Sequence, residues 1–112
     1  MATRCNIRVR FNTTERLFYR HLDGYPSCAG KDLVDLIDME VTDEPTMSDF
    51  TDFCNTIVED YGCEEVPVEA GDIEWYYDVS IDEAKVSCYS VDWRTGAKML
   101  VHDDLATTGD FN

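Results

Sequence analysis

The chain has 112 residues, which is enough for one domain over residues 1–112 and hardly for two. Its 44% hydrophobic and 29% charged residues are typical of a globular protein and argue against long disorder. The 24 acidic residues outnumber the 9 basic ones, and the net charge of −15 excludes a nucleic-acid-binding protein of the usual basic kind and disfavours binding to an anionic membrane.

The first part of the chain predicts a strand hairpin followed by a helix. Residues 3–11 alternate between apolar and polar side chains, as in a strand with one buried face. A turn at residues 12–15 leads to a second strand at residues 16–22, so the two strands form a hairpin. Residues 23–27 break the chain, and apolar residues then recur at helical spacing from about residue 28 to residue 40.

A second helix is predicted after a break at residues 42–45. Thr46 stands three residues before Asp49, which resembles a capping box with Asp in place of the usual Glu. Gly62 is suited to end the helix, because glycine adopts positive φ without strain. The apolar stripe between these ends predicts a core face, and it consists of Met47, Phe50, Phe53, Cys54, Ile57, Val58 and Tyr61.

Further strands are predicted in the last third of the chain. After an acidic connection at residues 63–71, residues 72–82 alternate regularly, and residues 85–93 form the next strand. A short edge strand can follow at residues 98–102. We therefore expect an α+β fold with a single antiparallel sheet of four or five strands and two helices on one face, in the order ββααββ with room for the further edge strand.

The charges are unevenly distributed along the chain. Residues 1–31 contain six basic and two acidic residues, whereas residues 32–84 contain 18 acidic residues and no Lys or Arg. If the first strand neighbours the strand at residues 72–82, we expect Arg4, Arg8 and Arg10 to meet Glu74, Asp78 and Asp82 on the open face of the sheet. The remaining negative charge must face solvent or a basic partner, and a halophilic origin is an alternative explanation for it.

The sequence predicts neither a disulfide framework nor a metal site. The cysteines are scattered without a C-x-x-C pair, and the acidic pairs lack EF-hand spacing, so no metal and no other cofactor is expected. The absence of a signal-peptide pattern and the unpaired cysteines predict a reduced, cytoplasmic protein. The cysteines are Cys5, Cys28, Cys54, Cys63 and Cys88.

Aromatic residues on the late strands are assigned to the core and the sheet surface rather than to base stacking, because the acids between them repel phosphate.

The turn around His21 and Asp23 is the best candidate for catalysis. An imidazole and a carboxylate can form an acid–base pair, and Tyr19 and Tyr25 flank them. Cys28 follows near a helix N-terminus, where a thiolate is favoured, so a Cys–His nucleophile is a further alternative. The structural interpretation is that His21 packs or forms a hydrogen bond while Asp23 shapes the turn.

The run from Tyr19 to Pro26, Tyr-Arg-His-Leu-Asp-Gly-Tyr-Pro, resembles a motif of small proteins from phages and bacterial mobile elements. The start at residues 2–5 and the segment at residues 72–75 match the same group less specifically. These proteins are largely uncharacterised, so the resemblance implies no catalytic residues. It implies a phage origin and, by association, an antagonist of host defence such as an anti-CRISPR protein. The motif residues are Tyr19, His21, Asp23, Gly24, Tyr25 and Pro26.

These observations predict a non-enzymatic inhibitor that binds a basic nucleic-acid-handling protein of a host defence system, such as a CRISPR effector. Its acidic surface would imitate DNA, and the protein itself would bind neither nucleic acid nor membrane. It would act as a monomer or homodimer in the cytoplasm of the bacterial host. The alternative is a small enzyme or ligand-binding protein centred on His21 and Asp23. The expected partner-binding residues are Asp43, Glu44, Asp49, Asp52, Glu59, Asp60, Glu64 and Glu65.

Overall fold

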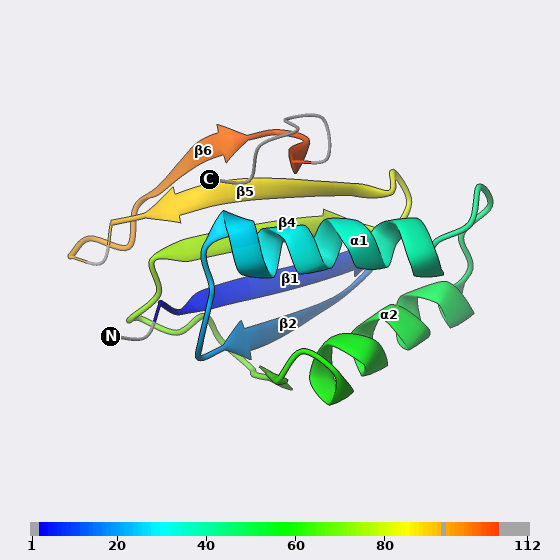
Figure 1. Cartoon of the computed structure of the whole chain (residues 1–112), viewed down its shortest axis with the longest axis horizontal. Coiled ribbons are helices and arrows are strands. Elements are labelled where there is room, and N and C mark those ends of the chain that lie inside the picture. The colour runs from blue at the N-terminus through cyan, green and yellow to red at the C-terminus, as the bar shows by residue number, and fades with distance from the viewer. Residues whose placement is uncertain (1–2, 93, 106–112) are drawn as a thin grey trace.

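Two helices cover one face of a six-stranded sheet in the computed structural model, which describes residues 3–92 and 94–105 (Figure 1). The α+β class agrees with the prediction, and so does the edge strand at residues 98–102. The helical elements are a short π-helix, η1 (Pro26–Gly30), and the helices α1 (Lys31–Glu40) and α2 (Met47–Glu59). The strands lie in the order β3-β2-β1-β4-β5-β6, and their bounds are β1 (Cys5–Phe11), β2 (Thr14–Arg20), β3 (Cys63–Glu65), β4 (Trp75–Ser80), β5 (Lys85–Val91) and β6 (Lys98–His102).

The sheet is mixed, so the expectation of a purely antiparallel sheet of four or five strands is wrong. β1 pairs antiparallel with β2 but parallel with β4. The cause is β3, which forms where only a connection was expected and adds to the free edge of β2. The chain then returns through residues 66–74 across the outer face of the sheet, on which no described helix lies, before β4 begins beside β1. Because of this return, β4 runs in the same direction as β1.

The return segment at residues 66–74 buries polar groups that the sequence placed on an open face. Asn6 is fully buried, and its Nδ2 donates to the Phe18 carbonyl oxygen at 3.1 Å. Its Oδ1 accepts the Ala70 N–H at 2.9 Å. At the start of the segment, the Val66 N–H donates to the Leu17 carbonyl oxygen at 2.9 Å. An amide satisfied on both sides in this way is stable in a buried position and holds the segment on the sheet.

The core lies between the two helices and the inner face of the sheet. The predicted inward faces of β1 and β4 are confirmed, but Tyr76 and Ser80 on the other face of β4 are buried as well. In α2, the middle of the predicted stripe is buried, but Met47 and Val58 at its margins are exposed. The sheet contributes Cys5, Ile7, Val9, Phe11, Tyr77, Val79 and Ile81, and the helices contribute Leu33, Val34, Leu36, Ile37, Phe50, Phe53, Cys54 and Ile57.

The predicted ends of α2 are confirmed. The Thr46 hydroxyl accepts the Asp49 N–H at 3.3 Å, and the Asp49 carboxylate accepts the Thr46 N–H at 3.1 Å. This reciprocal pair satisfies two N–H groups that the first helical turn leaves free. After the last turn, Gly62 has a φ of 69°, as expected for the glycine that ends a helix.

Two other predicted boundaries are shifted. α1 begins at Lys31 rather than near residue 28, because Pro26 opens a wide π-turn in which the Ala29 N–H donates to two carbonyl oxygens at once. β2 begins at Thr14 because Asn12, with a φ of 53°, closes the hairpin within two residues. Asn adopts this conformation more readily than most residues do, so the turn needs no glycine.

Candidate protein-docking surface

The basic side chains of this protein interact with groups of the same chain. Eight of the nine form ion pairs with acids of the same chain, and Arg94 also has a partner. Most of these pairs lie on the sheet or join it to a neighbouring segment. The cations of the sheet are therefore engaged by acids of the same chain.

Of Arg4, which precedes β1, and the two arginines of β1, only Arg10 meets an acid that the sequence predicted for it. Arg10 Nε lies 2.7 Å from Asp78 Oδ1, as expected for neighbouring strands. Arg4 instead pairs with Asp72 at 3.3 Å, and Arg8 pairs with Glu15 at 2.6 Å. Asp72 belongs to the return segment, which crosses the outer face, whereas Glu15 lies on β2, the neighbouring strand on the other side of β1. Of the other predicted partners, Asp82 accepts the Asn12 N–H at 2.7 Å, and Glu74 forms no ion pair with a described residue.

Most of the unpaired acids gather on the helical side of the molecule, while Glu64 lies opposite Tyr19 on the outer face of the sheet. Nine carboxylates form no ion pair and accept no hydrogen bond from the residues that the structure describes, and eight of them lie between residues 38 and 64. These eight span the end of α1, the loop before α2, the exposed side of α2 and the strand β3. We call them the acidic layer: Asp38, Glu40, Asp43, Glu44, Asp52, Glu59, Asp60 and Glu64.

Six of the eight acids predicted as a partner-binding set belong to the acidic layer, and two have structural roles. The Asp49 carboxylate caps α2 and also accepts the Thr42 hydroxyl at 3.3 Å. Glu65 binds both donor groups of Arg16, at 2.7 and 3.0 Å. This bidentate contact lowers the pKa of Glu65. The sequence analysis missed Asp38 and Glu40, although their position at the end of a predicted helix could have indicated them.

Several acids of this layer lie where they reduce the stability of the fold. Asp38 and Glu40 are in the last turn of α1, and Glu59 and Asp60 end α2, while neither helix has a basic residue in its last turn. The C-terminal end of a helix carries partial negative charge, so each acid there costs about 0.3–1 kcal/mol when exposed. Acids kept at unfavourable positions indicate a purpose other than folding.

A groove of about 420 Å³ opens between the end of α1 and the turn that joins β4 to β5. Its lining combines apolar carbon with carboxylates, which is the chemistry that suits a lysine or arginine side chain. The aliphatic stem of such a side chain can pack on the apolar part while its charged end faces the acids. The apolar residues are Ile37, Val41 and Pro45, and the acids are Asp38, Asp43, Asp82 and Glu83.

The turn around His21 does not form an acid–base pair in this structure. His21 Nδ1 lies 3.4 Å from both Arg4 Nε and the Tyr19 hydroxyl. The Asp23 carboxylate instead accepts the Tyr25 hydroxyl at 3.3 Å. His21 and Asp23 do line a shared cavity of about 220 Å³ next to the end of α2.

The rest of the motif is explained by packing. Gly24 lies so close to β1 that a Cβ atom there would stand 2.9 Å from the carbonyl carbon of Arg4. Its N–H donates to the Thr3 carbonyl oxygen at 2.9 Å, and its own carbonyl oxygen accepts the buried Tyr77 hydroxyl at 2.7 Å. Pro26 is buried and starts η1. The motif therefore joins the hairpin to the helices, and only its exposed side chains are available for another role.

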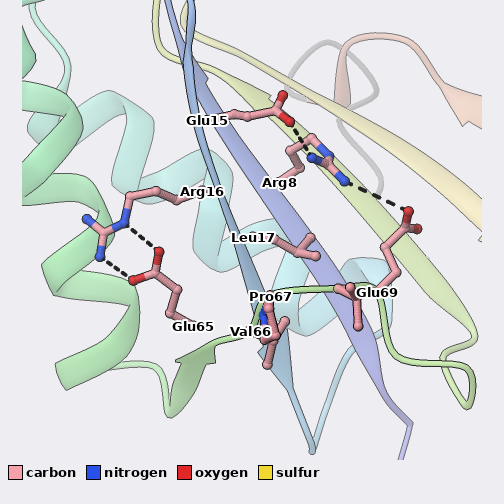
Figure 2. A pocket seen from close by; sticks show the side chains of 9 residues that line it. Arg8, Glu15, Arg16, Leu17, Glu65, Val66, Pro67 and Glu69 are labelled. Carbon is pink, nitrogen blue, oxygen red and sulfur yellow. Dashed lines mark hydrogen bonds and ion pairs between the residues drawn. The ribbon is translucent and has the colours of Figure 1, made fainter.

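A second hollow, of about 430 Å³, lies beside the return segment (Figure 2). Arg8 is held there between Glu15 at 2.6 Å and Glu69 at 3.8 Å, and its Nε donates to the Tyr76 hydroxyl at 2.7 Å. Arg16, the other cation of the lining, binds Glu65. Both cations are thus occupied, and the hollow lacks a charged group free to select a ligand.

The cysteines and aromatic residues have structural positions. The five cysteines are free thiols, and four of them are buried. Burial raises the pKa of Cys54, Cys63 and Cys88 to about 11 and that of Cys5 further. Tyr76 and Tyr77 are buried as well, and Trp93 lies outside the described residues. Among the described side chains, no group of three or more His, Cys, Asp or Glu is placed to hold a metal ion.

Searches against protein-family models, curated proteins and solved structures find no match to this chain. Within the described ranges, no helix has the length and apolar character needed to cross a bilayer.

Proposed function

We propose that this protein is a non-enzymatic inhibitor that occupies the nucleic-acid-binding surface of a basic protein. The observation that carries the proposal is the separation of charge. Eight of the nine cations are neutralised by acids of the same chain, most of them on the sheet side, whereas eight carboxylates, most of them on the helical side, have no ion partner among the described residues. A surface of this kind attracts a cationic groove over long range and accelerates association with it.

The spacing of the acids along α2 suits a groove that binds phosphates. Asp52 and Glu59 are seven residues apart, which places them about 10.5 Å apart along the helix axis. Asp43 and Glu44 extend the acidic layer beyond the start of α2, and Glu64 extends it beyond the end. The layer is less densely charged than DNA, which carries one charge per about 1.7 Å of axis. The acidic layer would therefore imitate only some of the phosphate positions of DNA.

The proposed partner is a nucleic-acid-handling protein of a bacterial defence system, and a CRISPR effector is the leading candidate. The resemblance of the Tyr19–Pro26 run to phage and mobile-element proteins supports this class. The groove at the end of α1 would take an arginine or lysine that otherwise contacts phosphate. The proposed site of action is the cytoplasm of the host bacterium.

The test compares two triple variants of equal charge. Asp52→Asn, Glu59→Gln and Asp60→Asn remove three charges from the acidic layer, whereas Asp72→Asn, Glu74→Gln and Asp92→Asn remove three from outside it. Each immobilised protein is exposed to a nuclease-treated lysate of bacteria that carry a CRISPR system, at low salt and at about 0.5 M salt, where the Debye length falls to about 4 Å.

The wild type and the control variant should capture a basic nucleic-acid-binding protein at low salt and release it at high salt. DNA should compete with the capture, and the acidic-layer variant should lose it. Equal capture by both variants would refute the proposal. Capture that survives high salt would also contradict it, because apolar contacts would then dominate the interface.

The cavity that His21 and Asp23 share supports a second candidate, a small enzyme or ligand-binding protein. Substituting His21→Ala should then abolish inhibition or ligand binding while the thermal midpoint stays unchanged. If every activity of the protein survives this substitution, the second candidate is wrong.

A further inference from the structure

We propose that a second copy of this chain pairs with the open edge of β6, in antiparallel orientation about a two-fold axis at Met99. The inference is independent of the proposed inhibitory function. β6 is the last strand of the sheet, and no other described strand pairs with its outer edge. Three adjacent apolar side chains of this strand are exposed: Met99 by 71%, Leu100 by 49% and Val101 by 42%. An exposed apolar edge strand is a template for pairing with another chain.

The lysine that would normally protect this edge strand points away from the open edge. A lysine on an edge strand normally discourages pairing by extending its charge into solvent. Lys98 instead folds back over the outer face, where its Nζ lies 2.7 Å from Glu69 and 4.7 Å from the centre of the Tyr76 ring. Its charge is therefore compensated within the chain and does not oppose an incoming strand.

The register between β5 and β6 shows which backbone groups face outward. The Asp92 N–H donates to the Ala97 carbonyl oxygen, and Met99 is paired with Ser90. Hydrogen-bonding direction alternates along an antiparallel strand, so the N–H and C=O groups of Lys98 and Leu100 point away from β5.

Two such edges are complementary when Met99 lies on the two-fold axis. Lys98 of one copy then exchanges both backbone hydrogen bonds with Leu100 of the other, which gives four bonds in all. Met99 faces its symmetry mate in a non-hydrogen-bonded pair. Ala97 faces Val101, so a small side chain meets a branched one. The irregularity in the pairing at Cys88 and Tyr89 disrupts the regular edge beyond Leu100, which confines the pairing to a short segment and favours a closed dimer.

Charge distribution favours this edge as the meeting point of two copies. Residues 93–102 contain Arg94, Lys98 and His102 and no acid, in a chain with a net charge of −15. α2 contacts β1 and β3 and therefore lies toward the edge of the sheet that is opposite to β6 (Figure 1). Five strand spacings, or about 24 Å, separate β3 from β6. This distance exceeds the Debye length of about 8 Å at physiological salt, so repulsion between the acids of α2 in the two copies is screened, whereas the acids of α1, which contacts β5, lie nearer to the edge.

The dimer should be weak. Two five-residue edges bury less than the roughly 800 Å² per partner of a standard interface. We therefore expect a dissociation constant above about 1 μM. Salt should strengthen the association because it screens the repulsion between the two acidic chains. This direction is opposite to that expected for a partner bound through the acidic layer.

The first test measures self-association of the full chain by sedimentation equilibrium up to about 1 mM protein, at low salt and at about 0.5 M salt. The wild type should approach twice the monomer mass, more readily at high salt. Met99→Lys should weaken dimerisation at least tenfold, because two like charges meet at the axis. Met47→Lys is the matched control, since Met47 is 48% exposed at the start of α2, which contacts β1 and β3. A wild type that stays monomeric throughout, or a dimer equally sensitive to both substitutions, would overturn the proposal.

The second test locates the axis by disulfide trapping in a Cys28→Ser background. Residues opposite each other in a non-hydrogen-bonded pair have Cα atoms about 4.5 Å apart, which is within disulfide range. Met99→Cys should therefore form a covalent dimer under mild oxidation much faster than Met47→Cys. Equal rates for the two variants would show that the copies meet by random collision, and the inference would be wrong.

Discussion

Replacing Asp60 with lysine should make the protein more stable and, at the same time, a poorer inhibitor. Asp60 is the C-cap of α2, where its N–H donates to the Thr56 carbonyl oxygen at 2.8 Å. An acid at this end of a helix is unfavourable by about 0.3–1 kcal/mol, and a base is favourable by a similar amount. Asp60→Lys should therefore raise the free energy of unfolding by about 0.6–2 kcal/mol. For a domain of this size, that corresponds to an increase of roughly 2–8 °C in the thermal midpoint.

The assay is urea unfolding followed by circular dichroism, with Asp52→Lys as the control. Both substitutions change the net charge by the same amount and relieve the same overall repulsion, but Asp52 lies away from the C-terminal end of α2. The difference between the two variants therefore isolates the helix-end effect, and it should shrink at about 1 M salt, where the Debye length is about 3 Å. If Asp60→Lys is no more stable than Asp52→Lys, the inference that acids at the C-terminal ends of the helices destabilise the fold is refuted. Partner capture by both variants should fall, because both remove charge from the acidic layer.

Three further predictions concern the fold. Asp49→Ala should lower the free energy of unfolding by about 1 kcal/mol in urea titrations, because it removes the carboxylate that caps α2, and Ser48→Ala next to it should have little effect. Gly24→Ala should cost about 1–3 kcal/mol, because its Cβ would meet the backbone of β1, and an unchanged thermal midpoint would contradict the structural account of the motif. At pH 8 a thiol reagent should label Cys28 well before the buried cysteines, which stay protonated in the folded state. Because the unfolded thiols release their protons near pH 8.5 and the folded ones near 11, stability should decrease as the pH rises between these values, as urea titrations would show.

Much of the local structure could be predicted from the sequence. The capping box of α2, the inward faces of β1 and β4 and the edge strand β6 depend on short-range patterns, and the structure has each of them. The predicted starts of β2 and α1 were shifted, because turn geometry at Asn12 and Pro26 determines them.

The surface was predictable in part. The acids of α2 and its flanking loops were identified from the imbalance of charge alone. Asp49 and Glu65 were misjudged, because only the structure shows that one caps a helix and the other binds Arg16. The groove at the end of α1 was not anticipated, since half of its carboxylates come from the distant turn after β4.

By itself, the sequence determined the α+β class, the amphipathic faces of the strands and helices, and the large excess of negative charge. These properties follow from composition and from periodicities of two and about 3.6 residues, which are local. The tertiary structure decided that β4 runs parallel to β1, that Asn6 is buried, and that eight cations meet acids of the chain while eight acids have no ion partner among the described residues. The first two depend on the three-residue strand β3 and on the return of the chain across the outer face. Contacts between residues far apart in the chain form only when the whole sheet is assembled, so no local pattern encodes them.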